Sequence, residues 1–200
     1  MSKDQKEEEV DQTIKAILVG ESGVGKTCLI NVCVGNPFDA NEKVTYANSF
    51  IEKKYKIDSE EYVINLWDTV GQEKYRTMAK IFYKDANIVI FVYDITNENS
   101  FNLLKDYWVR EVEENLVNPA VCAIVGNKKD LYAKEEISGD TVKEFANSKK
   151  MKFKLCSAKV DPQGFSDFVE ELLKDSKPFL VAREKLKLKK GKTKRSKCKC

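Results

Sequence analysis

The stretch Thr13-Ile14-Lys15-Ala16-Ile17-Leu18-Val19-Gly20-Glu21-Ser22-Gly23-Val24-Gly25-Lys26-Thr27 decides the fold of this chain. An apolar run typical of a buried strand leads into the pattern G-x-x-x-x-G-K-T, and Cys28-Leu29-Ile30-Asn31-Val32-Cys33 behind it has the character of a helix. Glycines let such a loop wrap closely round a phosphate chain, and the positive end of the following helix faces the same anion. This context predicts a nucleoside triphosphate site, whereas the pattern alone could be a glycine-rich turn that binds nothing.

Composition and charge predict one domain with a basic tail. The chain has 200 residues, of which 42% are hydrophobic, and a net charge of +3. Residues 183–200 contain ten Lys or Arg and one Glu, a net charge of +9, which leaves −6 for the other 182 residues. A mildly acidic body that ends in a strongly basic segment indicates a polyanionic surface as the partner of that segment.

The cysteines and the apolar runs indicate a protein of a reducing compartment. Four of the six cysteines, Cys28, Cys33, Cys122 and Cys156, lie in apolar segments, where a free thiol behaves as a small hydrophobe. Residues 1–12 are polar and rich in acidic residues, unlike a signal peptide, and no apolar run approaches the ~18 residues of a membrane span. We therefore expect a cytosolic protein without structural disulfides.

Alternating strand and helix patterns predict a doubly wound α/β fold. Strands are expected at 13–19, 48–57, 61–67, 87–93, 120–125 and 152–156, and helices at 26–34, 74–84, 99–115, 138–149 and 163–182. The mixed polarity of the second strand favours an edge position, joined to the third by a hairpin. The prediction is a mostly parallel six-stranded sheet with one antiparallel strand and about five helices on both faces. Residues 1–11 are expected to be a disordered extension, 12–182 the nucleotide-binding domain, and 183–200 a flexible tail.

Three further motifs follow predicted strands, at the sheet edge where ligands of such folds bind. In Asp68-Thr69-Val70-Gly71-Gln72-Glu73, the carboxylate can hold Mg²⁺ through water, the Gly71 N–H can reach a γ-phosphate, and Gln72 can orient an attacking water. In Asn127-Lys128-Lys129-Asp130, Asp130 can accept two hydrogen bonds from guanine, which adenine cannot donate. In Ser157-Ala158-Lys159 a small residue lets a backbone N–H approach the base. Each motif taken alone could also be an ordinary polar turn.

In this order and spacing, residues 20–27, Thr45, residues 67–73, 127–130 and 157–159 resemble a small GTPase of the Ras superfamily, over residues 12–182. Trp67, Phe82-Tyr83-Lys84-Asp85-Ala86 and Phe91-Val92-Tyr93-Asp94-Ile95-Thr96 are similar to segments of the Rab family, as is the ending Cys198-Lys199-Cys200. The resemblance implies the P-loop small G-domain fold and a GTP/GDP switch that hydrolyses GTP slowly and regulates vesicle trafficking.

The resemblance also implies roles for individual residues. Catalysis would involve Gln72, Lys26 and Gly71, and Mg²⁺ would be held by Thr27, Thr45 and, through water, Asp68. Phe38 would lie edge-on to the base. Effectors would meet Tyr46, Ala47, Phe50, Trp67 and Phe82, although the three aromatic residues could equally be core residues. The full set of nucleotide-binding residues is Gly20, Glu21, Ser22, Gly23, Val24, Gly25, Lys26, Thr27, Cys28, Phe38, Thr45, Asp68, Gly71, Asn127, Lys128, Asp130, Ser157, Ala158 and Lys159.

The expected partners of such a protein act on the switch and on its membrane anchor. They are effectors of the GTP form, an exchange factor, a GTPase-activating protein, a GDP-dissociation inhibitor and a Rab escort protein. Geranylgeranyl groups on Cys198 and Cys200, with the basic tail, would hold the protein on the cytoplasmic face of an intracellular membrane, in exchange with the cytosol. A monomer is expected. Alternatively, the tail could be a solvated linker or a nucleic-acid-binding arm, or Cys198 and Cys200 could form a disulfide. The tail lacks the aromatic residues that stack on bases, so no nucleic-acid partner is expected.

Two departures from the family pattern affect function. Thr45-Tyr46-Ala47-Asn48-Ser49-Phe50 stands where the family has T-I-G-x-x-F, and Val70 replaces the alanine of D-T-A-G-Q-E. The added bulk of Val70 would slow hydrolysis or alter exchange, unless the loop shifts to accommodate it. A second hypothesis is therefore a GTP-loaded membrane adaptor that scarcely turns over. A third, an ATP-dependent P-loop kinase, conflicts with Asp130.

Overall fold

The fold is built on a six-stranded sheet. The computed structural model describes residues 13–43, 45, 49–69 and 83–195, with side chains described as far as residue 180. The strand order is β2-β3-β1-β4-β5-β6, and β2 runs antiparallel to β3 while every other pair is parallel. The strands are β1 (Thr13–Val19), β2 (Ser49–Ile57), β3 (Glu60–Asp68), β4 (Ile88–Asp94), β5 (Val121–Asn127) and β6 (Lys152–Leu155). The predicted fold class is confirmed.

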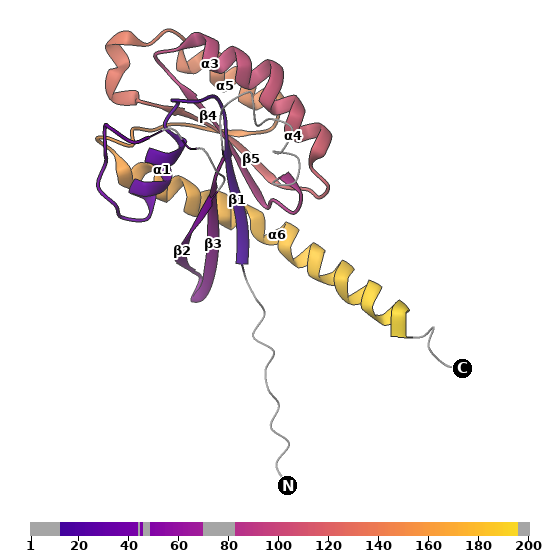
Figure 1. Ribbon diagram of the computed structural model, residues 1–200. Coiled ribbons are helices and arrows are strands. Elements are labelled where there is room, and N and C mark those ends of the chain that lie inside the picture. Colours follow the sequence, from indigo (N-terminus) through magenta and orange to yellow (C-terminus); the bar gives the residue numbers. More distant parts are fainter. Residues whose placement is uncertain (1–12, 44, 46–48, 70–82, 196–200) are drawn as a thin grey trace.

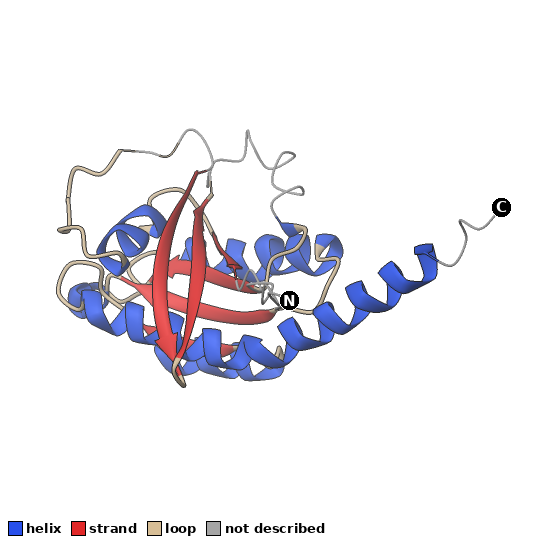
Figure 2. Cartoon of the chain, turned by 90° about the horizontal axis from the view of Figure 1, so that it is seen from below, coloured by secondary structure: helices blue, strands red, loops and turns tan. Residues whose placement is uncertain are grey.

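Helices cover both faces of the sheet, as Figures 1 and 2 show. Helices α1 (Lys26–Cys33) and α6 (Pro162–Arg195) pack on one face. The other face carries α3 (Glu98–Leu103), the π-helical turn η2 (Leu104–Trp108), α4 (Val109–Asn115) and α5 (Gly139–Ser148). A 3-10 segment, η3 (Lys129–Lys134), follows β5. Among the described residues, no helix is both long enough and apolar enough to cross a membrane.

Strand β1 shows how the sequence generates two cores. Ile14, Ala16 and Leu18 point to the layer of α1 and α6, while Ile17 and Val19 point to the layer of α3, α4 and α5. All seven residues of β4 are buried. Continuous apolar runs therefore lie in the centre of the sheet, as parallel strands covered on both faces require. Strand β2, with mostly exposed residues, lies at the edge.

Two helices differ from the sequence-based expectation. The predicted helix 99–115 exists, but the π-turn η2 interrupts it. The predicted helix 163–182 begins at Pro162 and continues to Arg195, through most of the segment expected to be a flexible tail. Residues 183–195 are mainly Lys, Arg, Leu and Glu, which favour helix, and Figure 1 shows this end projecting from the body. The predicted helix 74–84 lies largely outside the described residues.

Gly126 in β5 is required by close packing. A Cβ atom there would lie 2.6 Å from the Tyr93 hydroxyl and 2.7 Å from Cδ2 of Leu155. We expect Gly126→Ala to lower the free energy of unfolding in urea by about 1–3 kcal/mol, the usual cost of overpacking a core. The matched control is Gly139→Ala in α5, where the nearest atom to the added Cβ would be 3.5 Å away. Equal stability of Gly126→Ala and Gly139→Ala would contradict the packing around β5.

Candidate nucleotide-binding site

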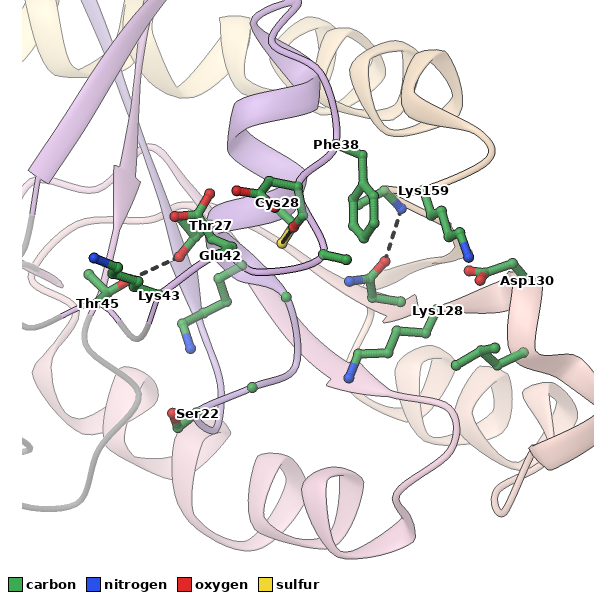
Figure 3. Close-up of a pocket in the computed structure, with 18 of the residues that line it drawn as sticks. Ser22, Thr27, Cys28, Phe38, Glu42, Lys43, Thr45, Lys128, Asp130 and Lys159 are labelled. Carbon is green, nitrogen blue, oxygen red and sulfur yellow. Dashed lines mark hydrogen bonds between the residues drawn. The ribbon is translucent and has the colours of Figure 1, made fainter.

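A pocket of about 340 Å³ lies where the loops after β1 and β5 meet. Figure 3 shows Ser22, Thr27 and Thr45 toward one end and Lys128, Asp130 and Lys159 toward the other. The predicted nucleotide-binding residues that line it are Ser22, Gly23, Gly25, Lys26, Thr27, Cys28, Phe38, Thr45, Asn127, Lys128, Asp130, Ala158 and Lys159. The structure thus brings together residues from three of the sequence motifs, with Phe38 and Thr45 from the chain between them, over more than a hundred positions.

The loop between β1 and α1 depends on glycine at two points of close approach. Gly20 has φ 149°, and a Cβ there would lie 2.2 Å from the carbonyl oxygen of Val92 in β4. Gly25 has φ 92°, and its Cβ would lie 2.3 Å from Nδ2 of Asn127 in β5. Both positions exclude a side chain, so the loop can lie directly against Val92 of β4 and Asn127 of β5.

Lys26 is a buried cation inside this loop. Its ammonium donates hydrogen bonds to the carbonyl oxygens of Gly20 and Glu21, each at 2.8 Å, and only 6% of the residue is exposed. Burial lowers the pKa of Lys26 to about 8, although the carboxylates of Asp68 and Glu21 favour the charged form. An anion bound in the loop would provide the charge partner that such a buried ammonium needs.

The three predicted metal ligands lie within hydrogen-bond distance of one another. The Thr27 hydroxyl donates to Oδ2 of Asp68 at 2.7 Å, and the Thr45 hydroxyl donates to the same oxygen at 3.0 Å. The two hydroxyl oxygens are 2.9 Å apart. Oδ1 of Asp68 is buried without a hydrogen-bond partner among the described residues. Such a set of oxygen ligands with one unsatisfied carboxylate atom fits Mg²⁺.

The loop after β5 is tied to the rest of the pocket by Asn127. Its Nδ2 donates to the carbonyl oxygen of Val24 at 2.9 Å, and its Oδ1 accepts from the N–H of Ala158 at 3.3 Å. Asp130 accepts a hydrogen bond of 2.6 Å from the Ser157 hydroxyl. These contacts hold the two loops, after β5 and after β6, together at the end of the pocket that contains Asp130.

Lys128 is positioned by a residue that the sequence analysis did not select. Its backbone is left-handed, with φ 65°, and its ammonium lies 2.6 Å from Oδ2 of Asp94. The other carboxylate oxygen of Asp94 accepts hydrogen bonds from the N–H of Thr96 at 2.9 Å and from its hydroxyl at 2.8 Å. No local sequence pattern marks this pair, because it depends on the register of the sheet, in which Asp94 at the end of β4 is paired with Asn127 at the end of β5.

A second group of unselected residues comes from the loop between α1 and β2. Asp39, Ala40, Glu42 and Lys43 line the pocket, together with Thr69 and Leu131. Nδ2 of Asn31 in α1 donates to Oε2 of Glu42 at 2.7 Å, and the Cys28 thiol lies 3.9 Å from the carbonyl oxygen of Asp39. Burial raises the pKa of Cys28. The residues between α1 and β2 belong to no motif, so no sequence signal pointed to them, whereas Thr69 lies inside the motif that follows β3.

Some predicted residues flank the pocket, and others cannot be placed. Gly20, Glu21, Val24, Asp68 and Ser157 contact pocket residues without lining it. The predictions for Tyr46, Ala47, Val70, Gly71, Gln72, Phe82, Cys198 and Cys200 lie outside the described residues.

The two described aromatic residues of the expected effector surface are stacked on the sheet. Phe50 and Trp67 face each other across β2 and β3, with ring centroids 4.8 Å apart, and the Lys15 ammonium lies 4.9 Å from the centroid of Trp67. Phe50 is 46% exposed. Phe50 is therefore not a core residue, the alternative that the sequence left open.

Comparison with known proteins assigns a family to this fold and pocket. The Ras family matches residues 15–177. The chain is 37% identical over 168 residues to Ras-related protein Rab-30 of Homo sapiens, covering 84% of this chain and 80% of that protein. It is 35% identical over 150 residues to GTP-binding protein YPT1 of Saccharomyces cerevisiae, with coverages of 75% and 72%. Over 149 residues it is 36% identical to Ras-related protein Rab-8B of Bos taurus, with coverages of 74% and 72%.

The buried Lys26 ammonium predicts a specific pH dependence of stability in the nucleotide-free protein. The pKa of Lys26 is about 8 in the folded protein against 10.5 when unperturbed, so between these values the folded state binds fewer protons than the unfolded state. Raising the pH through this window should stabilise the wild type relative to Lys26→Met, by up to about 1.36 kcal/mol per pH unit. Urea unfolding at a series of pH values in this window measures the difference.

The control for this series is Lys143→Met, at an exposed position of α5. It should leave the pH dependence of the wild type unchanged. Plots of unfolding free energy against pH that run parallel for the wild type and Lys26→Met, from below pH 8 to pH 10.5, would contradict a lowered pKa of Lys26 in the folded protein.

Proposed function

We propose that this chain, which belongs to the Ras family of small GTPases, is a Rab-type switch that cycles between GTP-bound and GDP-bound forms and regulates vesicle trafficking. The observation that supports this most strongly is one pocket that contains both Lys26 and Asp130. The first suits the phosphates of a nucleotide and the second suits a guanine base.

Asp130 carries the proposed preference for guanine. An ionised carboxylate can accept two hydrogen bonds, one from the N1–H and one from the exocyclic amine of guanine, whereas adenine would leave the charge unpaired. The hydrogen bond from Ser157, 2.6 Å long, restrains this carboxylate before a base arrives. Lys128, held by Asp94, would cover one face of the base with its aliphatic stem, and Phe38 lines the same pocket.

The phosphate end would act by position and charge. Lys26 would exchange its two carbonyl partners for phosphate oxygens, and the loop N–H groups would absorb further negative charge. Thr27, Thr45 and Asp68 are the residues that would hold Mg²⁺, which when bound neutralises phosphate charge. Gln72 would orient the attacking water and the Gly71 N–H would contact the γ-phosphate. We expect the unassisted rate of hydrolysis to be slow.

Thr45 would couple the nucleotide to the binding of partners. It lines the pocket and directly precedes the segment 46–50, which contains the proposed effector residues Tyr46, Ala47 and Phe50. Loss of the γ-phosphate would release this loop and with it the effector surface, which also includes Trp67 and Phe82. Prenylated Cys198 and Cys200 and the basic tail would keep the switch on the cytoplasmic face of a membrane, where the expected regulators act.

Exchange of one carboxylate oxygen for nitrogen tests guanine recognition. In Asp130→Asn the side chain donates as well as accepts, so it mismatches guanine but matches xanthine, which has an acceptor in place of the amine. We expect the affinity for GTP to fall at least roughly 100-fold and the affinity for XTP to rise. Competition binding measures both, with Asp140→Asn, at an exposed position of α5, as the control. Unchanged GTP affinity in Asp130→Asn would refute this role.

Hydrolysis distinguishes a regulated switch from a GTP-loaded adaptor. The sequence observation behind the adaptor is Val70, which stands where the family has alanine. Single-turnover hydrolysis of Mg²⁺-GTP should be slow in the wild type, similar in Val70→Ala, and abolished in Gln72→Leu. A wild type that does not hydrolyse GTP, beside a Val70→Ala variant that does, would instead support the GTP-loaded adaptor. Inactivation of such an adaptor would then depend on partner proteins.

A further inference from the structure

Trp108 lies at an irregular point of the helix that covers β4. It is the last residue of η2, and a π-helical turn inside an α-helix is rare and often marks a functional position. The side chain is 1% exposed and is the largest of the fully buried side chains in the described part of the chain. It belongs to the core layer that includes Val19 of β1 and Phe91 of β4. Packing alone would explain burial of the ring, but not the direction of its polar atom.

The indole N–H of Trp108 is directed at the phosphate-binding loop. Nε1 donates a hydrogen bond of 3.0 Å to Oε1 of Glu21, the second residue of the G-x-x-x-x-G-K-T pattern. A buried indole N–H requires an acceptor, and a carboxylate is the strongest that a protein offers. The bond spans 87 positions of the chain. It links the layer of α3 and α4 to a loop that continues into α1, on the opposite face of the sheet.

Among the described residues, this contact acts together with two others that hold the loop. Asn127 donates to the carbonyl oxygen of Val24 near its end, and Lys26 donates from within to the carbonyl oxygens of Gly20 and Glu21. Trp108 holds the beginning of the loop through the Glu21 side chain. Lys26 would leave its carbonyl partners for phosphate, whereas the bond from Trp108 involves no atom that the phosphate needs. It can therefore persist when a nucleotide is bound.

The negative charge of Glu21 is unfavourable near a bound phosphate, and the hydrogen bond from Trp108 restrains its position. A carboxylate at the start of an anion-binding loop repels phosphate if it turns toward the bound nucleotide. The neutral indole N–H restrains this carboxylate on the side of α4 without adding a competing cation. We propose that Trp108 is a positioning residue of the phosphate-binding loop, which slows nucleotide release by holding Glu21. This inference rests on the proposed binding of guanine nucleotides.

The test is a double-mutant cycle read out as the rate of nucleotide release. The full chain is loaded with a fluorescent GDP in Mg²⁺ buffer, and release is followed after addition of excess GDP, in the wild type, Trp108→Phe, Glu21→Ala and the double variant. Trp108→Phe keeps most of the apolar ring and removes the N–H. It should release GDP about tenfold faster, which corresponds to about 1.4 kcal/mol. A GTP analogue should be affected by the same factor.

The Glu21→Ala background separates positioning from packing. Any packing defect of Trp108→Phe is present in both backgrounds, whereas the hydrogen bond is absent from Glu21→Ala. The additional effect of Trp108→Phe should therefore fall to within about twofold in that background. In Glu21→Gln, which keeps an acceptor oxygen, the effect of Trp108→Phe should persist. Phe101→Leu, another change of a buried aromatic residue of the same helical region, should leave release unchanged.

Two outcomes would overturn the proposal. One is a wild-type rate of release in Trp108→Phe, and the other is an equal acceleration in the wild-type and Glu21→Ala backgrounds, which would show that Trp108 acts by packing alone. Failure of the proposed function is distinguishable from both. In that case the wild type itself would retain no fluorescent GDP, and the cycle could not be loaded.

Discussion

The close approach of the phosphate-binding loop to the ends of β4 and β5 is the constraint on which the rest of the structure depends. Without side chains at Gly20 and Gly25, the loop lies against Val92 and Asn127. That contact requires β1 to lie inside the sheet beside β4, with β5 next along, and the observed order satisfies this. Parallel strands then deliver the loops after β1, β3, β5 and β6 to one edge, where they form a single pocket.

The electrostatics of the pocket indicate a site built for an anion and a cation together. A buried ammonium with a lowered pKa, and a carboxylate with one oxygen unpaired within the described part of the chain, both carry a cost in the folded protein. Lys26 and Asp68 are held in place nevertheless, by backbone carbonyls in one case and by two threonine hydroxyls in the other. Such local costs are typical of functional sites, where a ligand completes the set of contacts. Neither residue is explained by the packing of the two cores.

The fold and much of the pocket could be predicted from local patterns, because both follow from chemistry that is local in the chain. A buried strand, a glycine loop and a helix predict the start of the sheet, and motifs after strands predict the lining. Contacts between distant segments carry no such local signature. The pairs Lys128–Asp94 and Trp108–Glu21, and the contribution of Glu42, depend on register and helix phase. The length of α6 could not be predicted either, because a run of lysines suits both a flexible tail and a helix.

The central claim, that this pocket holds a guanine nucleotide, is tested most directly by the nucleotide that accompanies the protein through purification. The full chain is purified in Mg²⁺ buffer without added nucleotide, denatured, and the released small molecules are separated and quantified against the protein. The account predicts close to one equivalent of GDP and GTP together, and their loss from the same preparation when Mg²⁺ is chelated. Adenine nucleotides in their place, or no nucleotide from folded protein, would contradict it.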